Sequence, residues 1–352
     1  EFRRVLFRSD SDFVWRQATR AKALDAVRGA LPAASLSNVG IYGSGQAFES
    51  LLLRMRAHPL PETRHYADLM LTELRKVIPS FLRRVDIPER GGAWTDYLAS
   101  TARDTAELAD DFLGTSIADE TDEVSLVDFD PDGEVKVVAA ALYPHSHLPE
   151  SQILALVDAM SVDRRTEILR AYVGDRDNRR HRPGRAFERT DYRFDILSDY
   201  GAFRDLQRHR ILTIEWQPLT PYHGYSKPEL LDASGTGALF DEVMDRSSSL
   251  FDALVGEHPQ QASYAVSMAY RLRYVMQFNA REAMHMLELR SSPQGHPAYR
   301  RVALEMHRQI AEVAGHRAIA AAMTHMTTEA PELERLASER AAERRRGSAQ
   351  AQ

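Results

Sequence analysis

The sequence contains no cysteine among its 352 residues. This absence excludes disulfides, zinc–thiolate sites and every mechanism that uses a thiol nucleophile. Positive charge is not in excess either, because the chain has 45 Lys and Arg residues and 51 Asp and Glu residues. It therefore has no overall positive electrostatic field that would attract a nucleic acid. No run approaches the roughly 18 consecutive apolar residues that a membrane span needs, and no secretory leader pattern is present. We therefore expect a cytoplasmic protein with neither a membrane nor a nucleic acid as partner.

The composition is that of a packed protein, with 43% hydrophobic residues in a chain long enough for two domains. Two terminal segments are set apart. Residues 1–9 read like a translated sequencing adapter, so we treat them as an artefact and expect the true chain to begin earlier. Residues 331–352 are charged and rich in alanine, which predicts a solvated helix and tail.

Residues 47–77 and 283–313 align with each other without a gap. Matching positions include the pairs Ala47 and Ala283, Arg54 and Arg290, and Pro61 and Pro297. Because the matches recur at helical spacing around a shared proline, they predict a duplicated helix–turn–helix unit. The chain would then hold residues 10–115, the C-terminal helical part of a degenerate first repeat, and residues 116–330, a complete second domain.

The second domain shows the patterns of an α+β fold. Residues 124–129 alternate like a strand and close in an Asp-Pro-Asp-Gly turn. Residues 134–143 could be a hairpin partner or a helix, and their alanines favour a helix. Further strands are expected at 187–197 and 211–216, and helices at 149–160, 162–173, 200–207, 239–254, 261–289 and 297–323. Together these predict a small mixed or antiparallel sheet flanked by long helices.

Arg208-His209-Arg210 places two permanent cations around an imidazole at a predicted helix-to-strand junction. Arginine forks suit phosphates, carbonyl edges and ring oxygens. Taken alone, the tripeptide could equally be a solvated basic turn. It gains weight from a second polar segment about seventy residues later.

That second segment is predicted to be a helix. Arg281, His285 and Leu289 recur every four residues, so they would share one helix face. A simpler alternative is an amphipathic helix whose arginines pair with Glu282 and Glu288. A plain core helix would need neither arrangement.

The joint spacing of Arg208-His209-Arg210, Asn279-Ala280-Arg281 and Glu288-Leu289-Arg290 resembles the flavin-dependent thymidylate synthases, which use no cysteine nucleophile. The resemblance implies a helix-rich fold with two tandem repeats in this chain. It also implies FAD as cofactor, NADPH and methylenetetrahydrofolate as co-substrates, and conversion of the nucleotide dUMP to dTMP. A homo-oligomer is implied as well, which for a duplicated chain would be a dimer that mimics a tetramer.

The same resemblance assigns roles to individual residues. Arg290 and Arg208 would be catalytic, with Arg290 holding the pyrimidine. The positions implied to contact FAD are Arg208, His209, Arg210, Glu215, Asn279, Arg281, His285 and Leu289. The positions implied to bind the nucleotide are Arg290, Arg28 and Gln217. No metal is expected.

Several positions depart from the family pattern. Thr213, Glu215, Trp216, Pro218 and Thr220 stand where the family places Ser, Asn, Glu, Ser and Arg after Arg-His-Arg, and Asp205 replaces a glutamine before it. Ser263 replaces the arginine of an Arg-x-x-Leu-Pro element. Each lost hydrogen bond to a phosphate would cost about 1.5 to 3 kcal/mol.

The first repeat keeps an Arg-x-x-Leu-Pro element of its own, from Arg28 to Pro32. Arg28 could therefore complete a nucleotide site whose other residues come from the second repeat. Alternatively, Arg28 is simply a cation at the end of its helix, before Gly29. Two other functions stay open: a divergent flavin- or nucleotide-binding protein of the same fold, and an RNA-binding helical protein, which the net charge disfavours.

Overall fold

The computed structural model describes residues 10–329, 333 and 335–350. The chain forms two compact units: the first contains the residues up to Ala33, Thr121–Phe251 and the residues from Ala265 onward, and the second contains Ala34–Glu120 and Asp252–Tyr264. Residues 10–33 thus belong with the sheet-containing unit, although the predicted repeat boundary lies near residue 115. The adapter-like segment 1–9 lies outside the described residues. The boundaries of the repeats stay a prediction.

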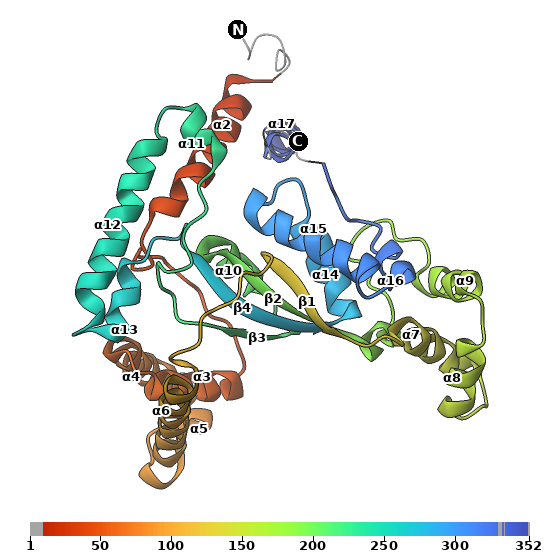
Figure 1. The fold of residues 1–352 in the computed structure, drawn as a ribbon, viewed down its shortest axis with the longest axis horizontal. Helices are drawn as coiled ribbons and strands as arrows, with labels where there is room; N and C mark the ends of the chain where they lie inside the picture. Colours follow the sequence, from red (N-terminus) through yellow and green to blue (C-terminus); the bar gives the residue numbers. More distant parts are fainter. Residues whose placement is uncertain (1–9, 330–332, 334, 351–352) are drawn as a thin grey trace. The chain divides into compact units, whose positions relative to one another are not determined.

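A four-stranded antiparallel sheet organises the first unit (Figure 1). Its strands are β1 (Val124–Phe129), β2 (Asp191–Asp199), β3 (Thr213–Trp216) and β4 (Arg271–Asn279), in the order β1-β2-β4-β3. β2 and β4 pair along their whole length, from Asp191 opposite Asn279 to Asp199 opposite Arg271. The predicted helix-rich α+β fold with a small sheet is confirmed, and the sheet is antiparallel throughout.

The sheet is built from strands that alternate apolar and polar residues. The buried apolar side chains of its two central strands are Tyr192, Phe194, Ile196, Leu272, Tyr274, Met276 and Phe278. Helices α10 (Tyr200–Leu206) and α15 (Pro297–Glu312) pack against these strands, and α14 (Ala280–Arg290) packs on both β4 and α15. Figure 1 shows α14 running from the end of β4 beside α15. The main core lies between the sheet and these helices.

Among the other helices of the first unit, those at Gly133–Leu142, Glu150–Asp158, Val162–Val173 and Gly237–Val255 match predicted segments. These other helices are α2 (Asp12–Val27), α7 (Gly133–Leu142), α8 (Glu150–Asp158), α9 (Val162–Val173), α11 (Glu229–Ala233), α12 (Gly237–Val255, whose last residues fall in the second unit), α16 (Arg317–Ala321) and α17 (Leu336–Gln350). Short 3-10 turns stand at η1 (Arg28–Ala30), η3 (Tyr143–His145), η4 (Arg185–Arg189) and η5 (Ser263–Ala265, at the unit boundary). The ambiguous segment 134–143 is helical, and part of the predicted charged tail forms α17, which packs on α2.

The second unit is helical in its described residues. It contains α3 (Gly45–Ala57), α4 (Pro61–Arg75), α5 (Pro79–Leu82), the π-helical turn η2 (Pro88–Gly92), α6 (Ala93–Leu113) and α13 (Pro259–Ala262). Pro61 begins α4 as Pro297 begins α15, and each helix packs on the one before it in sequence. The two helix pairs agree in order and in proline position, as the proposed duplication requires.

The prediction of one long helix at 261–289 is wrong. Residues 271–279 form β4, and the helix begins only at Ala280. The four buried residues Leu272, Tyr274, Met276 and Phe278 occur at every second position, and this period of two places them on one face of a strand. The helix expected at 297–323 is also interrupted, because α15 ends at Glu312 and Gly315 adopts a φ of 73° before α16. No helix of the described residues is long and apolar enough to cross a membrane.

Candidate functional site

Asn279 joins the last strand of the sheet to α14. It is the N-cap of the helix, with extended backbone angles, and its side-chain oxygen accepts a hydrogen bond from the backbone N–H of Glu282 at 2.9 Å. Because β4 is clamped between β2 and β3, this cap fixes the first turn of α14 relative to the sheet. The side chain of Glu282 therefore starts from a well-defined position.

Only one stripe of α14 reaches the solvent. Arg281, His285 and Leu289 are half-buried, whereas every other residue from Ala280 to Arg290 is buried. The predicted shared face of these three residues is therefore present. These three residues are the part of α14 with the most solvent access.

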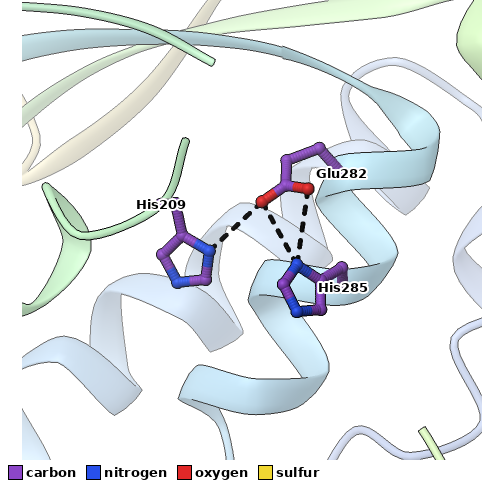
Figure 2. A group of neighbouring side chains, drawn as sticks. All are labelled: His209, Glu282 and His285. Atoms are coloured by element: carbon purple, nitrogen blue, oxygen red, sulfur yellow. Dashed lines mark hydrogen bonds and ion pairs between the residues drawn. The ribbon is translucent and has the colours of Figure 1, made fainter. Parts of the chain in front are cut away.

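Four side chains from α14 and the Arg-His-Arg segment form a connected network. The Nε–H of Arg290 donates to Nε2 of His209 at 2.9 Å. Since an arginine has no acceptor, Nε2 of His209 must accept, and the proton of its imidazole lies on Nδ1. Nδ1 of His209 lies 3.2 Å from Oε1 of Glu282, to which it donates, and Nδ1 of His285 lies 3.3 Å from the same oxygen (Figure 2).

The protonation states of this network follow from its burial. Burial lowers the pKa of His209, and the charge of Arg290 lowers it further. Burial alone would raise the pKa of Glu282, but hydrogen bonds from His209 and His285 outweigh it and bring this pKa to about 2. Burial also lowers the pKa of Arg290, and the positive charge of Arg208 lowers it further. A guanidinium nevertheless remains charged at neutral pH. A neutral imidazole thus stands between a cation and a carboxylate.

The ligand atoms of His209, Glu282 and His285 lie within 4.8 Å of one another, as metal ligands could. A metal ion on Nδ1 of His209 would need a lone pair at that nitrogen. The hydrogen bond from Arg290 assigns the lone pair to Nε2 and the proton to Nδ1. The three residues as arranged fit a hydrogen-bonded relay better than a metal centre.

Asp205, at the end of α10, faces three arginines of the first unit. Its Oδ1 forms an ion pair with Arg208 and lies 3.8 Å from Nη1 of Arg290, and its Oδ2 lies 3.6 Å from Nη2 of Arg28. Arg28 also lies 3.7 Å from Asp25 on α2. The structure therefore brings Arg28 close to Arg208 and Arg290 within one unit of a single chain.

A cavity of about 450 Å³ opens beside Arg28. It is lined in part by Asp199, Lys227, His296 and Arg301. Burial raises the pKa of Asp199 and lowers that of His296. Nη2 of Arg28 is buried and has no hydrogen-bond partner among the described residues. A cavity of this size, with the side chain of Arg28 among its lining residues, can admit a polar anionic group.

The remaining predicted site residues lie around this centre with different exposures. The side chain of Arg208 is 66% exposed, and Arg210 is exposed as well. Arg281 donates to the carbonyl of Pro183 at 3.0 Å and to Oε1 of Glu188 at 3.2 Å. Glu215 and Gln217, on and just after the edge strand β3, are exposed, and the structure describes no side-chain hydrogen bond from either to the network.

The alternative in which the arginines of α14 pair with Glu282 and Glu288 is wrong. Glu282 bonds two histidines, and Glu288 forms a buried bridge to Arg176 at 2.5 and 2.7 Å. The sequence could have indicated the role of Glu282, because it precedes His285 by three residues on a helix. The role of Asp205 had no signal beyond its place before Arg-His-Arg.

Comparison with known families bears on this site. Residues 125–315, more than half of the chain, match the family described as thymidylate synthase complementing protein. The chain belongs to that family. The match includes β1, the Arg-His-Arg segment and α14, and it confirms the family that the motifs resembled.

The similarity to curated relatives extends over more of the chain than the family match does. A UPF0159 protein of Chlamydia pneumoniae is 40% identical over 293 residues, which cover 83% of this chain and 55% of that protein. A UPF0159 protein of Thermoplasma acidophilum is 32% identical over 303 residues, 85% of this chain and 59% of its own length. The chain thus spans little more than half the length of these relatives. A solved UMP/dUMP methylase from Streptomyces cacaoi, bound with 5-Br dUMP, is 18% identical, with a TM-score of 0.43, and the match covers 56% of this chain and 94% of that one.

Proposed function

We propose that the protein is an FAD-dependent thymidylate synthase, which methylates dUMP to dTMP with methylenetetrahydrofolate and NADPH as co-substrates. The observation that carries this proposal is the convergence of Arg28, Arg208 and Arg290 on Asp205, beside the accessible stripe of α14. Three arginines around one carboxylate, with Arg28 also lining the cavity, suit an anionic nucleotide. Membership of the thymidylate synthase complementing protein family supports the same activity.

The residues present suit FAD in their donor chemistry. Arg208 and Arg210 are exposed, and Arg281 and His285 are half-buried, so their N–H groups can reach the phosphate and carbonyl oxygens of a cofactor. Leu289, on the same stripe of α14, offers apolar surface to a flat ring. When bound, FAD would supply the hydride chemistry of the reaction.

Two predicted FAD residues would act indirectly. The side chain of His209 is engaged by Arg290 and Glu282, and that of Asn279 caps α14. We therefore propose that they position their neighbours, while Glu215 retains its predicted role at the edge of the site. Arg281 would exchange its bond to Glu188 for a bond to the cofactor.

Arg290 is proposed to hold the pyrimidine. Its Nε is fixed by His209, and its Nη groups, of which Nη1 lies 3.8 Å from Asp205, would turn to a carbonyl oxygen of uracil. Since Arg290 is buried, its charge acts in a medium of low dielectric constant. It would stabilise the negative charge that develops on the ring when hydride adds.

Arg28 is proposed to hold the nucleotide phosphate. Its side chain lines the cavity, its buried Nη2 lacks a hydrogen bond among the described residues, and it supplies the cation that Pro218, Thr220 and Ser263 do not. Gln217 stays a predicted nucleotide contact. The site would therefore combine Arg28, from the predicted first repeat, with residues of the second.

The test uses the purified chain. Bound flavin should give absorbance bands in the visible region. Turnover of dUMP with methylenetetrahydrofolate and NADPH should then yield dTMP. Protein that never binds FAD would contradict the proposal.

A divergent binding protein of the same fold is the second candidate. It is favoured by Asp205, whose carboxylate occupies the arginines that a nucleotide phosphate would use. Flavin binding without turnover of dUMP would select this candidate. A homo-oligomer and a cytoplasmic location are proposed with either function.

A further inference from the structure

Asp205 offers its carboxylate to three guanidinium groups at once. Oδ1 faces Arg208 and Arg290, and Oδ2 faces Arg28. The side chain of Asp205 is 16% exposed and that of Arg290 only 10%, so solvent screens their interaction weakly. A phosphate needs the same guanidinium N–H groups that a carboxylate uses. An anion that enters this cluster therefore meets a negative charge already in place.

The arginines are gathered by Asp205 without being saturated. Its distances of 3.6 Å to Arg28 and 3.8 Å to Arg290 are longer than hydrogen bonds. Nη2 of Arg28 is buried and lacks a hydrogen-bond partner among the described residues. Donors thus remain for a ligand, while the net positive charge of the cluster is reduced.

We infer that Asp205 determines the specificity of this site, by lowering its affinity for phosphate groups relative to uncharged nucleosides. The carboxylate repels an incoming phosphate and competes with it for Arg28, while its pairing with Arg208 and Arg290 lowers the positive charge nearby. An uncharged ligand loses nothing to this repulsion. The inference rests on the proposed function only in placing the nucleotide at this cluster.

The experiment replaces the carboxylate by the amide of the same size, Asp205→Asn, in the full chain. Inorganic pyrophosphate, dUMP and uncharged deoxyuridine are titrated into each protein by calorimetry at fixed ionic strength. We expect pyrophosphate and dUMP to bind about tenfold more tightly to Asp205→Asn, with deoxyuridine unchanged. The gain should shrink as salt is raised, because it is electrostatic.

Two further variants control the result. Asp205→Glu keeps the charge and should bind pyrophosphate within about threefold of the wild type. Asp195→Asn removes a carboxylate paired with Arg273 on the sheet, at 3.1 Å, and should leave binding unchanged. If Asp205→Asn does not fold, Asp205→Gln tests the same charge change.

Equal or weaker pyrophosphate binding by the amide variants would overturn the inference, because the carboxylate would then serve only to hold the arginines in place. This outcome is separable from failure of the proposed function. A chain without FAD binding or dUMP turnover, but with tighter pyrophosphate binding in Asp205→Asn, would refute the synthase and support the inference. A working synthase whose pyrophosphate binding is unchanged in Asp205→Asn would support the proposed function and refute the inference.

Discussion

The Nε–H of Arg290 donates to Nε2 of His209 across 2.9 Å, although 81 positions separate the two residues. The other nitrogen of His209 donates to Glu282, which in turn is placed by the cap of α14. The orientation of the proposed pyrimidine-binding arginine therefore depends on a carboxylate that does not contact it.

This dependence predicts the effect of Glu282→Gln. The neutral amide can no longer hold the proton of His209 on Nδ1 as firmly, so Arg290 loses its fixed acceptor. A hydrogen bond to a charged group contributes about 1.5 to 3 kcal/mol, so kcat/KM for dUMP should fall by about tenfold or more. Steady-state kinetics would measure it, with Glu305→Gln on α15 as control. Unchanged kcat/KM in a folded Glu282→Gln protein would contradict the relay.

Substituting Arg281→Ala should release FAD. The residue lies on the accessible stripe of α14 and is proposed to contact the cofactor, so the affinity for FAD should fall by about tenfold or more. The fold should persist, because the core-facing residues of the helix are untouched. Flavin absorbance after desalting would measure retention, and Arg193→Ala, paired with Asp128 on the sheet, is the control. Full retention of FAD by Arg281→Ala would remove this residue from the cofactor site.

Arg28→Ala should weaken nucleotide binding without affecting FAD. A partly buried arginine fork on a phosphate contributes about 2 kcal/mol, which corresponds to a loss of more than tenfold in affinity for dUMP. Arg20→Ala removes an exposed arginine from α2, the helix that ends directly before Arg28, and is the matched control. Titration of dUMP into both variants would decide, and equal affinities would exclude Arg28 from the site.

Arg176 and Glu288 form a bridge whose side chains are almost completely buried. Removal of one partner leaves an uncompensated charge in the interior, so Glu288→Gln should lower the free energy of unfolding by about 3 to 5 kcal/mol. The double variant Arg176→Met with Glu288→Leu should recover much of this loss. Denaturant unfolding would measure both, and a single variant as stable as the wild type would show that the bridge contributes little.

Stability should fall as the pH drops below neutrality. Burial lowers the pKa values of His209, His296 and His316 in the folded chain, whereas in the unfolded chain histidine titrates near 6.5. Below about pH 6.5 the unfolded chain therefore takes up protons that the folded chain resists, and the free energy of unfolding decreases. Melting temperatures at pH 7.5 and 5.5 would show it as a lower Tm at pH 5.5. The contribution of Glu282 to the free energy of unfolding should be lost at lower pH, between about pH 4.5 and its folded-state pKa of about 2.

The sequence predicted most elements of the sheet and the site because their patterns are local. Helical spacing alone predicts that Arg281, His285 and Leu289 share a face, because residues four positions apart lie on the same side of a helix. The strand at 271–279 was missed because its continuous run into the helical segment hid the change of period at Asn279. The contacts of Asp205 with Arg28 and Arg290 could not be predicted, since they depend on how α2, α10 and α14 pack, and no local pattern encodes that packing.

The chain passes between its two units at residues 33, 120, 251 and 264. Shortening the protein from either end can therefore isolate neither unit, because each consists of segments separated in sequence. A minimal version of the sheet-containing unit would need two new linkers, one from Ala33 to Thr121 and one from Phe251 to Ala265. A protease that cuts within residues 34–120 would separate the segment up to Ala33, with Arg28, from the polypeptide that holds all four strands, and only noncovalent contacts would then join these parts of the sheet-containing unit.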